Sequence, residues 1–304
     1  MISFFKNPQY DFVGKRKIAF GISLFLILLG IISIIAHGGL RYGVDFTGGN
    51  LVQIKFEKPY DVGKLRQILL NDVHLKSVEI QTFGDPSTFL LRYKETFDAD
   101  KLAKLLSRKT GLKVIVERNE TVGPRVGKEL QMKAVEALAV GLFLMLIYIW
   151  IRFDFAFGLG SVIALFHDVF ITVGLLSLFN REFTIQTVAA LLTIVGYSIN
   201  DSIVVSDRIR EELRKYSQGI SVKKMIEIFN TSINATLSRT VITSLTTLIV
   251  LISILLFGGP VIFDFALALT IGVIIGTYSS IFVVASLVIE WKLRKARKSP
   301  AIKS

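Results

Sequence analysis

Residues 191–214, LLTIVGYSINDSIVVSDRIREELR, place an ionisable side chain inside an apolar run. The chain carries no charged residue from Phe183 to Asn200, and its apolar character continues past Asp201 as far as Asp207. An aspartate near the centre of a membrane helix costs about 2.5–3.5 kcal/mol on insertion scales, so its presence requires a reason. The stretch predicts a membrane-spanning helix with a functional carboxylate. The alternative is an aspartate that only reaches water at the helix end.

The polar residues of this stretch define a predicted helix face. Four of them recur at helical spacing: Thr193, Tyr197, Asn200 and Asp201. Residues separated by three, four, seven or eight positions share one side of an α-helix. We therefore expect this side to face other helices.

The composition indicates a polytopic membrane protein. Hydrophobic residues make up 52% of the 304 residues, and the mean hydropathy is +0.57. The net charge is +12, but Lys and Arg gather in short segments beside apolar runs, a pattern that sets membrane orientation and does not indicate nucleic-acid binding. The chain has no cysteine, which excludes disulfides and cysteine metal sites. We expect no nucleic-acid partner, no metal and no cofactor.

Apolar runs predict six membrane spans with both chain ends in the cytoplasm. The first, at 18–36, follows a basic segment at 1–17 and lacks a signal-peptide cleavage pattern, so we expect an uncleaved helix. The other five spans fall within 133–289, followed by a basic cytoplasmic tail at 290–304. Their predicted positions are 134–151, 155–178, the run around 191–206, 240–263 and 265–289, with a basic cytoplasmic segment at 207–238.

The segment 37–132 has the composition of a small soluble domain, and its place after the first span predicts that it lies outside the cytoplasm. Alternating apolar residues predict strands, and apolar residues at helical spacing predict helices. The strands fall at 51–56, 78–83, 89–93 and 112–117, the helices at 61–70 and 98–109, and a turn at 84–87. The order βαββαβ is that of a ferredoxin-like α+β fold.

Two glycine-bearing segments, 42–49 and 122–130, flank this domain. Their notable residues are Asp45, Gly48 and Gly49 in the first, and Gly123, Pro124 and Gly127 in the second. The second is similar to a phosphate-binding loop, but it has three residues between its glycines and Glu129 where Ser or Thr would hold magnesium. We therefore expect both segments to be linkers, and an ion gradient to be the energy source.

The third predicted span contains His167 and Asp168 near its midpoint. Two interpretations remain open: a proton path, or a buried pair that is hydrogen-bonded and structural. Adjacent residues on a helix point about 100° apart. We therefore expect only one of the two side chains to face a given partner.

Polar residues also recur along the start of the fifth span, at Ser232, Thr236, Arg239, Thr243 and Thr246. We expect this stripe to face the interior of the bundle, with Arg239 paired to Asp201. The last span carries small residues at Gly272, Gly276 and Ser280. These indicate close helix packing.

Five ordered motifs together resemble the SecD/SecF family of bacterial protein-export membrane proteins. They are YGVDFTGG from Tyr42, VGPRVGKEL from Val122, FHDV from Phe166, VGYSINDSIVVSDRIREEL from Val195 and LSRTVITSLTT from Leu237. The resemblance covers nearly the whole chain and implies half of a resistance-nodulation-division (RND) fold. The length resembles the stand-alone SecF type more than SecD or a fusion of the two.

The resemblance implies an auxiliary subunit of the Sec translocase in the bacterial inner membrane, and not an enzyme. Such a subunit works with SecD and uses the proton motive force to drive or complete preprotein translocation through SecYEG, after the ATP-driven steps of SecA. Membrane lipids, YajC and YidC are further implied partners. In the family, the Asp of NDSIVV and the Arg of LSRT are implicated in proton transport, and they match Asp201 and Arg239. Asn200, His167 and Asp168 are candidate supporting residues.

Two other functions stay open at this point. The chain could be a structural stabiliser in which Asp201 and Arg239 form a static ion pair, or half of a small-molecule exporter of the same superfamily. Such exporters usually carry two larger exterior domains on twelve helices. A static pair predicts that exchanging the two residues restores function, whereas a proton carrier would not tolerate the exchange.

Overall fold

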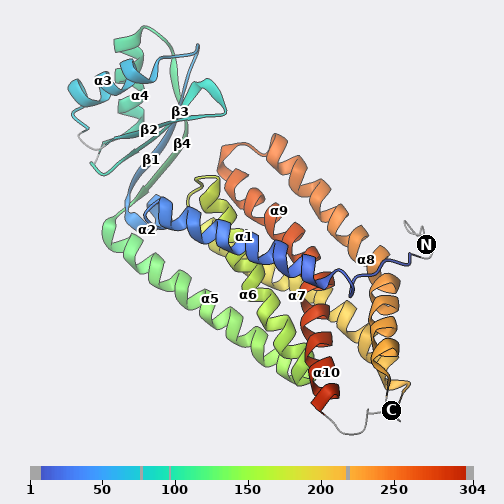
Figure 1. Ribbon diagram of the computed structural model, residues 1–304. Helices are drawn as coiled ribbons and strands as arrows, with labels where there is room; N and C mark the ends of the chain where they lie inside the picture. The colour runs from blue at the N-terminus through green and yellow to red at the C-terminus, as the bar shows by residue number, and fades with distance from the viewer. Residues whose placement is uncertain (1–7, 76–77, 96, 217–219, 299–304) are drawn as a thin grey trace. The chain divides into compact units, whose positions relative to one another are not determined.

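The computed structural model describes residues 8–75, 78–95, 97–216 and 220–298. The chain divides into two compact units. The first consists of Met1–Arg41, Ala137–Glu182 and Gln186–Ser304, and the second of Tyr42–Glu136 and Phe183–Ile185. The first unit is helical, and the second contains the β-sheet (Figure 1).

Within the described residues, six helical segments are long and apolar enough to cross a membrane, as predicted. Five of them are α1 (Arg16–Ala36), α5 (Pro124–Arg152), α6 (Phe155–Leu178), α7 (Ile185–Arg214) and α8 (Val222–Phe257). The sixth is a continuous path made of α9 (Pro260–Ser279), the π-helical segment η1 (Ser280–Val284) and α10 (Ala285–Lys298). A π-helical turn inside a long helix is often found at functional sites.

The bounds of two helices differ from the predicted ones. Helix α8 begins at Val222, well before the predicted position, because Ser221 caps it by accepting a hydrogen bond from the Lys224 backbone N–H. The predicted basic segment 207–238 therefore completes α7 and opens α8, while residues 217–219 lie outside the described residues. Gly259 adopts a φ of 73°, and the chain turns there, so residues 261–263 belong to α9 and not to the fifth span.

Small residues bring the helices of the first unit into close contact. A Cβ atom at Gly174 of α6 would lie 2.6 Å from the Gly30 Cα atom of α1. Between α7 and α9, a Cβ atom at Gly272 would lie 2.2 Å from the Ile194 side chain. The predicted packing role of Gly272 is confirmed, and Gly30 and Gly174 add a crossing that the sequence analysis did not single out.

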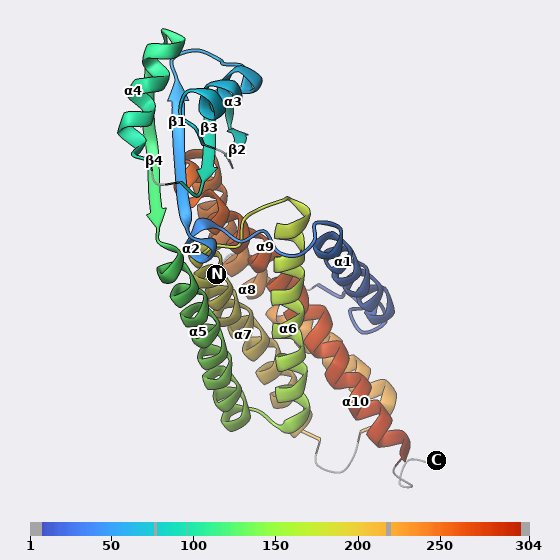
Figure 2. The same ribbon diagram turned by 90° about the vertical axis from the view of Figure 1, so that its left-hand side faces the viewer.

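The second unit contains a four-stranded antiparallel sheet in the order β2-β3-β1-β4, shown in Figure 2. Its elements are β1 (Gly49–Phe56), α3 (Val62–Asn71), β2 (Glu79–Phe83), β3 (Asp85–Tyr93), α4 (Ala99–Thr110) and β4 (Val114–Val122). Both helices bury leucines against one face of the sheet, where Ile54 and Phe89 are fully buried. This confirms the ferredoxin-like arrangement. The hairpin between β2 and β3 is tighter than predicted, because Gly84 (φ 75°) alone separates the strands.

The two glycine-bearing segments pack against each other and are not free linkers. The first contains a short helix, α2 (Val44–Thr47), followed by Gly48 with a φ of 69°. A Cβ atom at Gly48 would lie 2.8 Å from the Pro124 Cα atom, and one at Gly127 would lie 3.0 Å from the Gly48 backbone nitrogen. Pro124 is the first residue of α5, so the linker predicted after Gly123 is helical.

Asp45 of α2 contacts the first residue of α7. Its Oδ2 atom accepts a hydrogen bond of 3.0 Å from the backbone N–H of Ile185. The backbone N–H of Gly43 donates to the carbonyl oxygen of Phe183. Asp45 therefore has a structural partner inside the second unit.

Candidate functional site

Asp201 of α7 is buried, and one of its carboxylate oxygens lacks a hydrogen-bond donor. The residue is 3% exposed, and its Oδ2 atom accepts no hydrogen bond from any described residue. A buried polar atom without a partner carries a desolvation penalty of about 1–3 kcal/mol, and more when it is charged. Such atoms are rare in folded proteins, and each one calls for an explanation.

The predicted polar face of α7 is wrong in part. Asp201 is buried on the same side of the helix as Ser198, whereas Thr193 and Asn200 are exposed on the surface of this chain. The Thr193 hydroxyl donates to the Ala189 carbonyl oxygen at 2.9 Å and therefore needs no other helix. The positions of the polar residues in the sequence did not show which side of α7 packs against the neighbouring helices.

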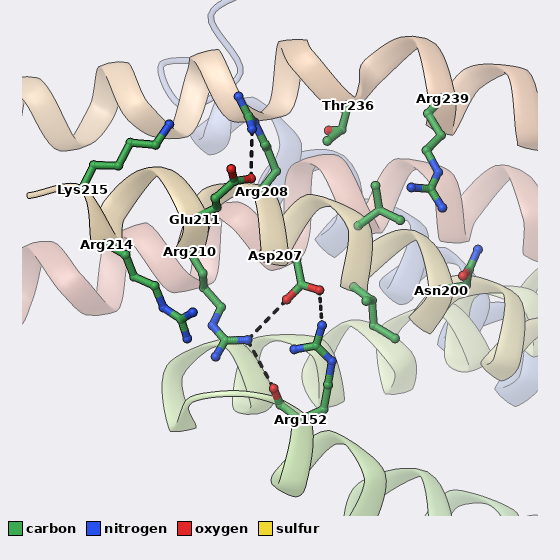
Figure 3. A pocket seen from close by; sticks show the side chains of 12 residues that line it. Arg152, Asn200, Asp207, Arg208, Arg210, Glu211, Arg214, Lys215, Thr236 and Arg239 are labelled. Atoms are coloured by element: carbon green, nitrogen blue, oxygen red, sulfur yellow. Dashed lines mark hydrogen bonds and ion pairs between the residues drawn. The ribbon is translucent and has the colours of Figure 1, made fainter.

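Arg239 of α8 does not pair with Asp201 in this structure. Its guanidinium is exposed and makes no hydrogen bond or ion pair with any described residue. It lines a crevice of about 900 Å³ together with Asn200 and Thr236, and Arg214 lines the same crevice (Figure 3). The predicted Asp201–Arg239 ion pair is thus absent from this conformation.

The other polar residues of α8 divide between two environments. Ser232 and Thr236 are buried, as predicted, whereas Thr246 is exposed on the surface of this chain. The threonine hydroxyls donate to carbonyl oxygens of their own helix, such as Thr243 to Arg239 at 3.1 Å and Thr246 to Ile242 at 3.0 Å. Because these bonds are local, the stripe does not need to face the bundle interior.

Ion pairs organise the Arg152 end of the crevice, where the ends of α5 and α7 meet (Figure 3). Asp207 pairs with Arg152 and with Arg210, the latter at 3.3 Å. Arg210 also lies 3.3 Å from the Asp154 carboxylate and donates to the Arg152 carbonyl oxygen. These cations are neutralised within the chain, in contrast to Arg239.

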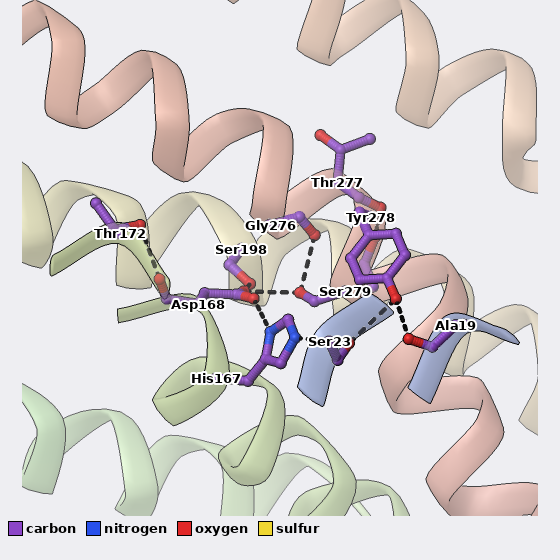
Figure 4. A network of polar contacts seen from close by, with 11 residues as sticks. Ala19, Ser23, His167, Asp168, Thr172, Ser198, Gly276, Thr277, Tyr278 and Ser279 are labelled. Carbon is purple, nitrogen blue, oxygen red and sulfur yellow. Dashed lines mark hydrogen bonds and ion pairs between the residues drawn. The ribbon is translucent and has the colours of Figure 1, made fainter. Parts of the chain in front are cut away.

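His167 and Asp168 lie together at the centre of a buried polar network (Figure 4). The two side chains are 2.8 Å apart, from His167 Nδ1 to Asp168 Oδ1. The other carboxylate oxygen, Oδ2, accepts hydrogen bonds from Ser198 of α7 at 2.5 Å and from Ser279 of α9 at 2.7 Å. Asp168 is fully buried, and both of its oxygens have partners.

The network continues from His167 into α1 and α9. His167 Nε2 lies 2.9 Å from Ser23 Oγ, and Ser23 Oγ lies 3.1 Å from Tyr278 Oη. Tyr278 Oη donates to the Ala19 carbonyl oxygen at 2.6 Å. As expected, each partner faces only one residue of the pair: Ser23 contacts His167, whereas Ser198 and Ser279 contact Asp168. The two side chains also contact each other.

The sequence analysis missed four members of this network: Ser23, Ser198, Tyr278 and Ser279. Each is a hydroxyl residue inside an otherwise apolar helix, and this is the signal that could have identified them. Among the described residues, no group of three or more His, Asp or Glu side chains could hold a metal ion.

Six apolar helices, a ferredoxin-like domain and carboxylates buried within the helices define a polytopic membrane protein of the half-RND type. Models of known families match the chain in two places. "Protein export membrane protein SecD/SecF, C-terminal" matches residues 102–294, and "SecD/SecF GG Motif" matches residues 33–59. The chain belongs to the SecD/SecF family of protein-export membrane proteins.

Similar proteins of this family come from several bacteria. The chain is 48% identical to the protein translocase subunit SecF of Calditerrivibrio nitroreducens, over 93% of this chain and 94% of the relative. It is 41% identical to SecF of Escherichia coli O157:H7, over 94% and 89% of the two chains. A crystal structure of SecDF from Thermus thermophilus, described as a translocon-associated membrane protein, matches with a TM-score of 0.83 at 43% identity. That match covers 95% of this chain and 39% of the SecDF chain.

Proposed function

We propose that this chain is an auxiliary subunit of the Sec translocase, and that it works with SecD to convert the proton motive force into preprotein movement. In this proposal it drives or completes translocation through SecYEG after the ATP-dependent steps of SecA. Asp201 takes up and releases the proton, and Arg239 responds to its charge. Membrane lipids surround the helices, and YajC and YidC are further candidate partners.

The observation that carries the proposal is the buried Oδ2 atom of Asp201, which has no donor. A carboxylate that no hydrogen bond stabilises as an anion is more easily protonated than one that accepts several. A movement that brought Arg239 toward Asp201 would favour the charged form again. Asp201 therefore has the surroundings of a group that can change its protonation state during a cycle.

The surface of the first unit supports a SecD partner. Asn200 and Arg239 are polar side chains on membrane-spanning helices, yet both are exposed on this chain. Lipid cannot satisfy a guanidinium at membrane depth, so a second set of helices should cover this surface. The SecDF relative carries additional chain beyond the part that this protein matches. We expect the SecD-type half to contribute an acidic residue here.

The proposed orientation places both chain ends in the cytoplasm of a bacterial inner membrane. Basic residues flank the first and last spans at their terminal ends, which is the arrangement of cytoplasmic segments. The segment 37–132 is then extracytoplasmic. The crevice lined by Arg152, Arg214 and Arg239 would open toward the cytoplasm and give water a route toward the level of Asn200.

The energy of a proton fits such a role. One proton that crosses about 100 mV releases roughly 2.3 kcal/mol. A shift of a two-state equilibrium from 1:99 to 99:1 requires about 5.5 kcal/mol. A full stroke at that potential would thus use about two or three protons.

The absence of an Asp201–Arg239 contact bears on the structural alternative. A chain that only stabilises its partners through a static ion pair should show that pair, whereas the Oδ2 atom of Asp201 accepts no hydrogen bond from Arg239 or from any other described residue. A half exporter for small molecules has no supporting observation beyond the shared fold. The proton-driven translocase subunit is therefore the function that we favour.

The test is preprotein translocation into inverted vesicles that contain Asp201→Asn together with SecD. We expect the gradient-stimulated part of translocation to disappear and the SecA-dependent part to remain, because asparagine cannot carry the proton. Glu211→Gln is a matched control, since Glu211 lies on the same helix but is exposed and paired with Arg208. Normal gradient stimulation in Asp201→Asn vesicles would refute the proposal.

A further inference from the structure

The His167–Asp168 network contains more acceptor contacts than its hydroxyl protons can fill. Tyr278 Oη must donate its only proton to the Ala19 carbonyl oxygen, because a carbonyl cannot donate. The contact between Tyr278 Oη and Ser23 Oγ, at 3.1 Å, then requires the single proton of Ser23. No hydroxyl proton is left for the contact of 2.9 Å between Ser23 Oγ and His167 Nε2. His167 Nε2 must therefore carry a proton of its own.

The opposite side of the imidazole ring requires a second proton. The contact of 2.8 Å between His167 Nδ1 and Asp168 Oδ1 needs a proton on one of the two atoms. The hydroxyls of Ser198 and Ser279 cannot supply it, because both donate to the other oxygen, Oδ2. If every one of these contacts is a hydrogen bond, the His167–Asp168 pair holds two protons. It then consists either of an imidazolium and a carboxylate or of a neutral imidazole and a carboxylic acid.

Removal of one proton leaves the network incomplete. A neutral ring with its proton on Nε2 would set the Nδ1 lone pair against the ionised Asp168 Oδ1 atom, so the contact of 2.8 Å between them would have no proton. A neutral ring with its proton on Nδ1 would keep that contact but would need Ser23 to donate to Nε2. The contact between Ser23 of α1 and Tyr278 of α9 would then have no proton, unless Tyr278 gave up its bond to Ala19. With the proton on Nδ1, one of the two links between α1 and Tyr278 is therefore lost.

We propose that the His167–Asp168 pair is a proton-binding site of the transmembrane unit, and that its second proton completes the link between α1 and α9. The site is separate from Asp201. The groups that face it are Ser23 and the Ala19 carbonyl from α1, Tyr278 and Ser279 from α9, and Ser198 from α7. The titratable residue that follows Ser198 on the buried side of α7 is Asp201, less than one turn further on.

The site also differs from a static buried pair in its connections. It touches α1, α6, α7 and α9, and a change in its proton count alters the contacts of α1 with His167 of α6 and Tyr278 of α9. Asp201 lies on one of these helices. Proton binding at the pair does not depend on proton transfer by Asp201.

The test is nitrogen-15 NMR of histidine in the full chain, reconstituted in lipid nanodiscs. The chain has three histidines. His37→Gln and His74→Asn remove the other two, and asparagine suits the left-handed φ of 62° at His74. We expect protons on both ring nitrogens at neutral pH, or a proton on Nε2 together with a protonated Asp168 carboxyl seen in its carbon-13 signal. A ring that holds a single proton, on either nitrogen, beside an ionised Asp168 at every pH from mildly acidic to neutral would overturn the proposal.

Two conservative variants separate this site from a merely structural network. Tyr278→Phe releases the Ser23 proton for Nε2, so we expect about a tenfold loss of affinity for the second proton, the effect of one hydrogen bond. Ser33→Ala breaks the contact of 3.1 Å between Ser33 and Ser177, which also links α1 to α6 but does not touch the pair. It should leave the proton affinity unchanged. Equal effects of the two variants would contradict the coupling, and neither result depends on Asp201.

Discussion

Asp168 and Asp201 are both carboxylates on membrane-spanning helices, and both are buried, at 0% and 3% exposure. They differ in their donors. Asp168 contacts His167 and accepts from two serines, whereas the buried oxygen of Asp201 accepts from no described residue. Equal burial thus accompanies two different surroundings: Asp168 has donors on several helices, whereas the buried oxygen of Asp201 has none. The two carboxylates therefore differ in the hydrogen-bond donors around them and not in how deeply they are buried.

The difference has its origin in how the helices pack. Near Asp168, a Cβ atom added to Gly276 of α9 would lie 3.1 Å from the Ser198 side chain, so α7 and α9 approach closely and their hydroxyls reach the carboxylate. The Thr236 hydroxyl of α8 behaves differently. Thr236 donates to the Ser232 carbonyl oxygen within its own helix and offers nothing to Asp201.

The largest expected effect is on the folding stability of Asp168→Ala. The substitution leaves three polar side chains in the bundle without their acceptor, and loss of one member of a buried charged network typically costs about 3–5 kcal/mol. Denaturant-induced unfolding of the chain in nanodiscs measures this loss. Ser198→Ala removes only one donor and should cost less, about 1.5–3 kcal/mol. If Asp168→Ala lowered the free energy of unfolding by less than Ser198→Ala does, Asp168 would not be the centre of the network.

Asp201→Asn should have a much smaller effect in the same unfolding experiment. Since the buried oxygen of Asp201 has no donor to lose, we expect a change of less than about 1 kcal/mol, as for residues without a specific stabilising contact. The contrast with Asp168→Ala is the sharpest check on the comparison. If Asp201→Asn destabilised the chain as strongly as Asp168→Ala, Asp201 would have a structural partner, and the difference between the two carboxylates would disappear.

The smallest effect concerns a third carboxylate, Asp11, which has donors but lies in water. It accepts hydrogen bonds from the Gly14 backbone N–H and the Asn230 side chain, both at 2.8 Å, and these bonds lower its pKa below the ordinary 3.8. In the unfolded chain the pKa returns to its ordinary value. The stabilisation is therefore complete above about pH 4 and is lost as the pH falls through the lower, folded value.

Hydrogen exchange can detect this loss. The backbone N–H groups of Tyr10 and Val13 donate to Asn234 and Asn230 of α8 at 3.1 and 3.0 Å. We expect their protection to fall in acid in the wild-type chain and to depend less on pH in Asp11→Asn. Loss of protection near neutral pH would mean that another group controls this segment.

Much of the fold could be predicted from the sequence, because its signals are local. Helix α6 begins and ends where the apolar run does, since the lack of charge over a membrane thickness is a property of the run itself. The βαββαβ order follows from apolar periodicity for the same reason. The basic segment after Asp207 was harder, because its residues up to Arg214 continue α7 and those from Val222 belong to α8.

The candidate site could be predicted only in part. Asp201, Arg239, His167 and Asp168 stand out as ionisable residues in apolar helices. Their partners do not, because Ser23 and Ser279 are far from His167 and Asp168 in the chain and resemble any other serine. The contact between residues 10–13 and α8 was missed for a similar reason, since nothing local marks Asn230 and Asn234 as acceptors for that segment.

The sequence by itself determined which segments enter the membrane, which segment forms the mixed domain, and which ionisable residues lie at membrane depth. These properties depend on the transfer of each segment from water, which is a sum over its own residues. Only the tertiary structure decided that Asp168 receives donors from several helices while Asp201 and Arg239 remain apart. Hydrogen bonds between helices depend on rotations and distances of a few tenths of an ångström, and packing among all the helices sets these together.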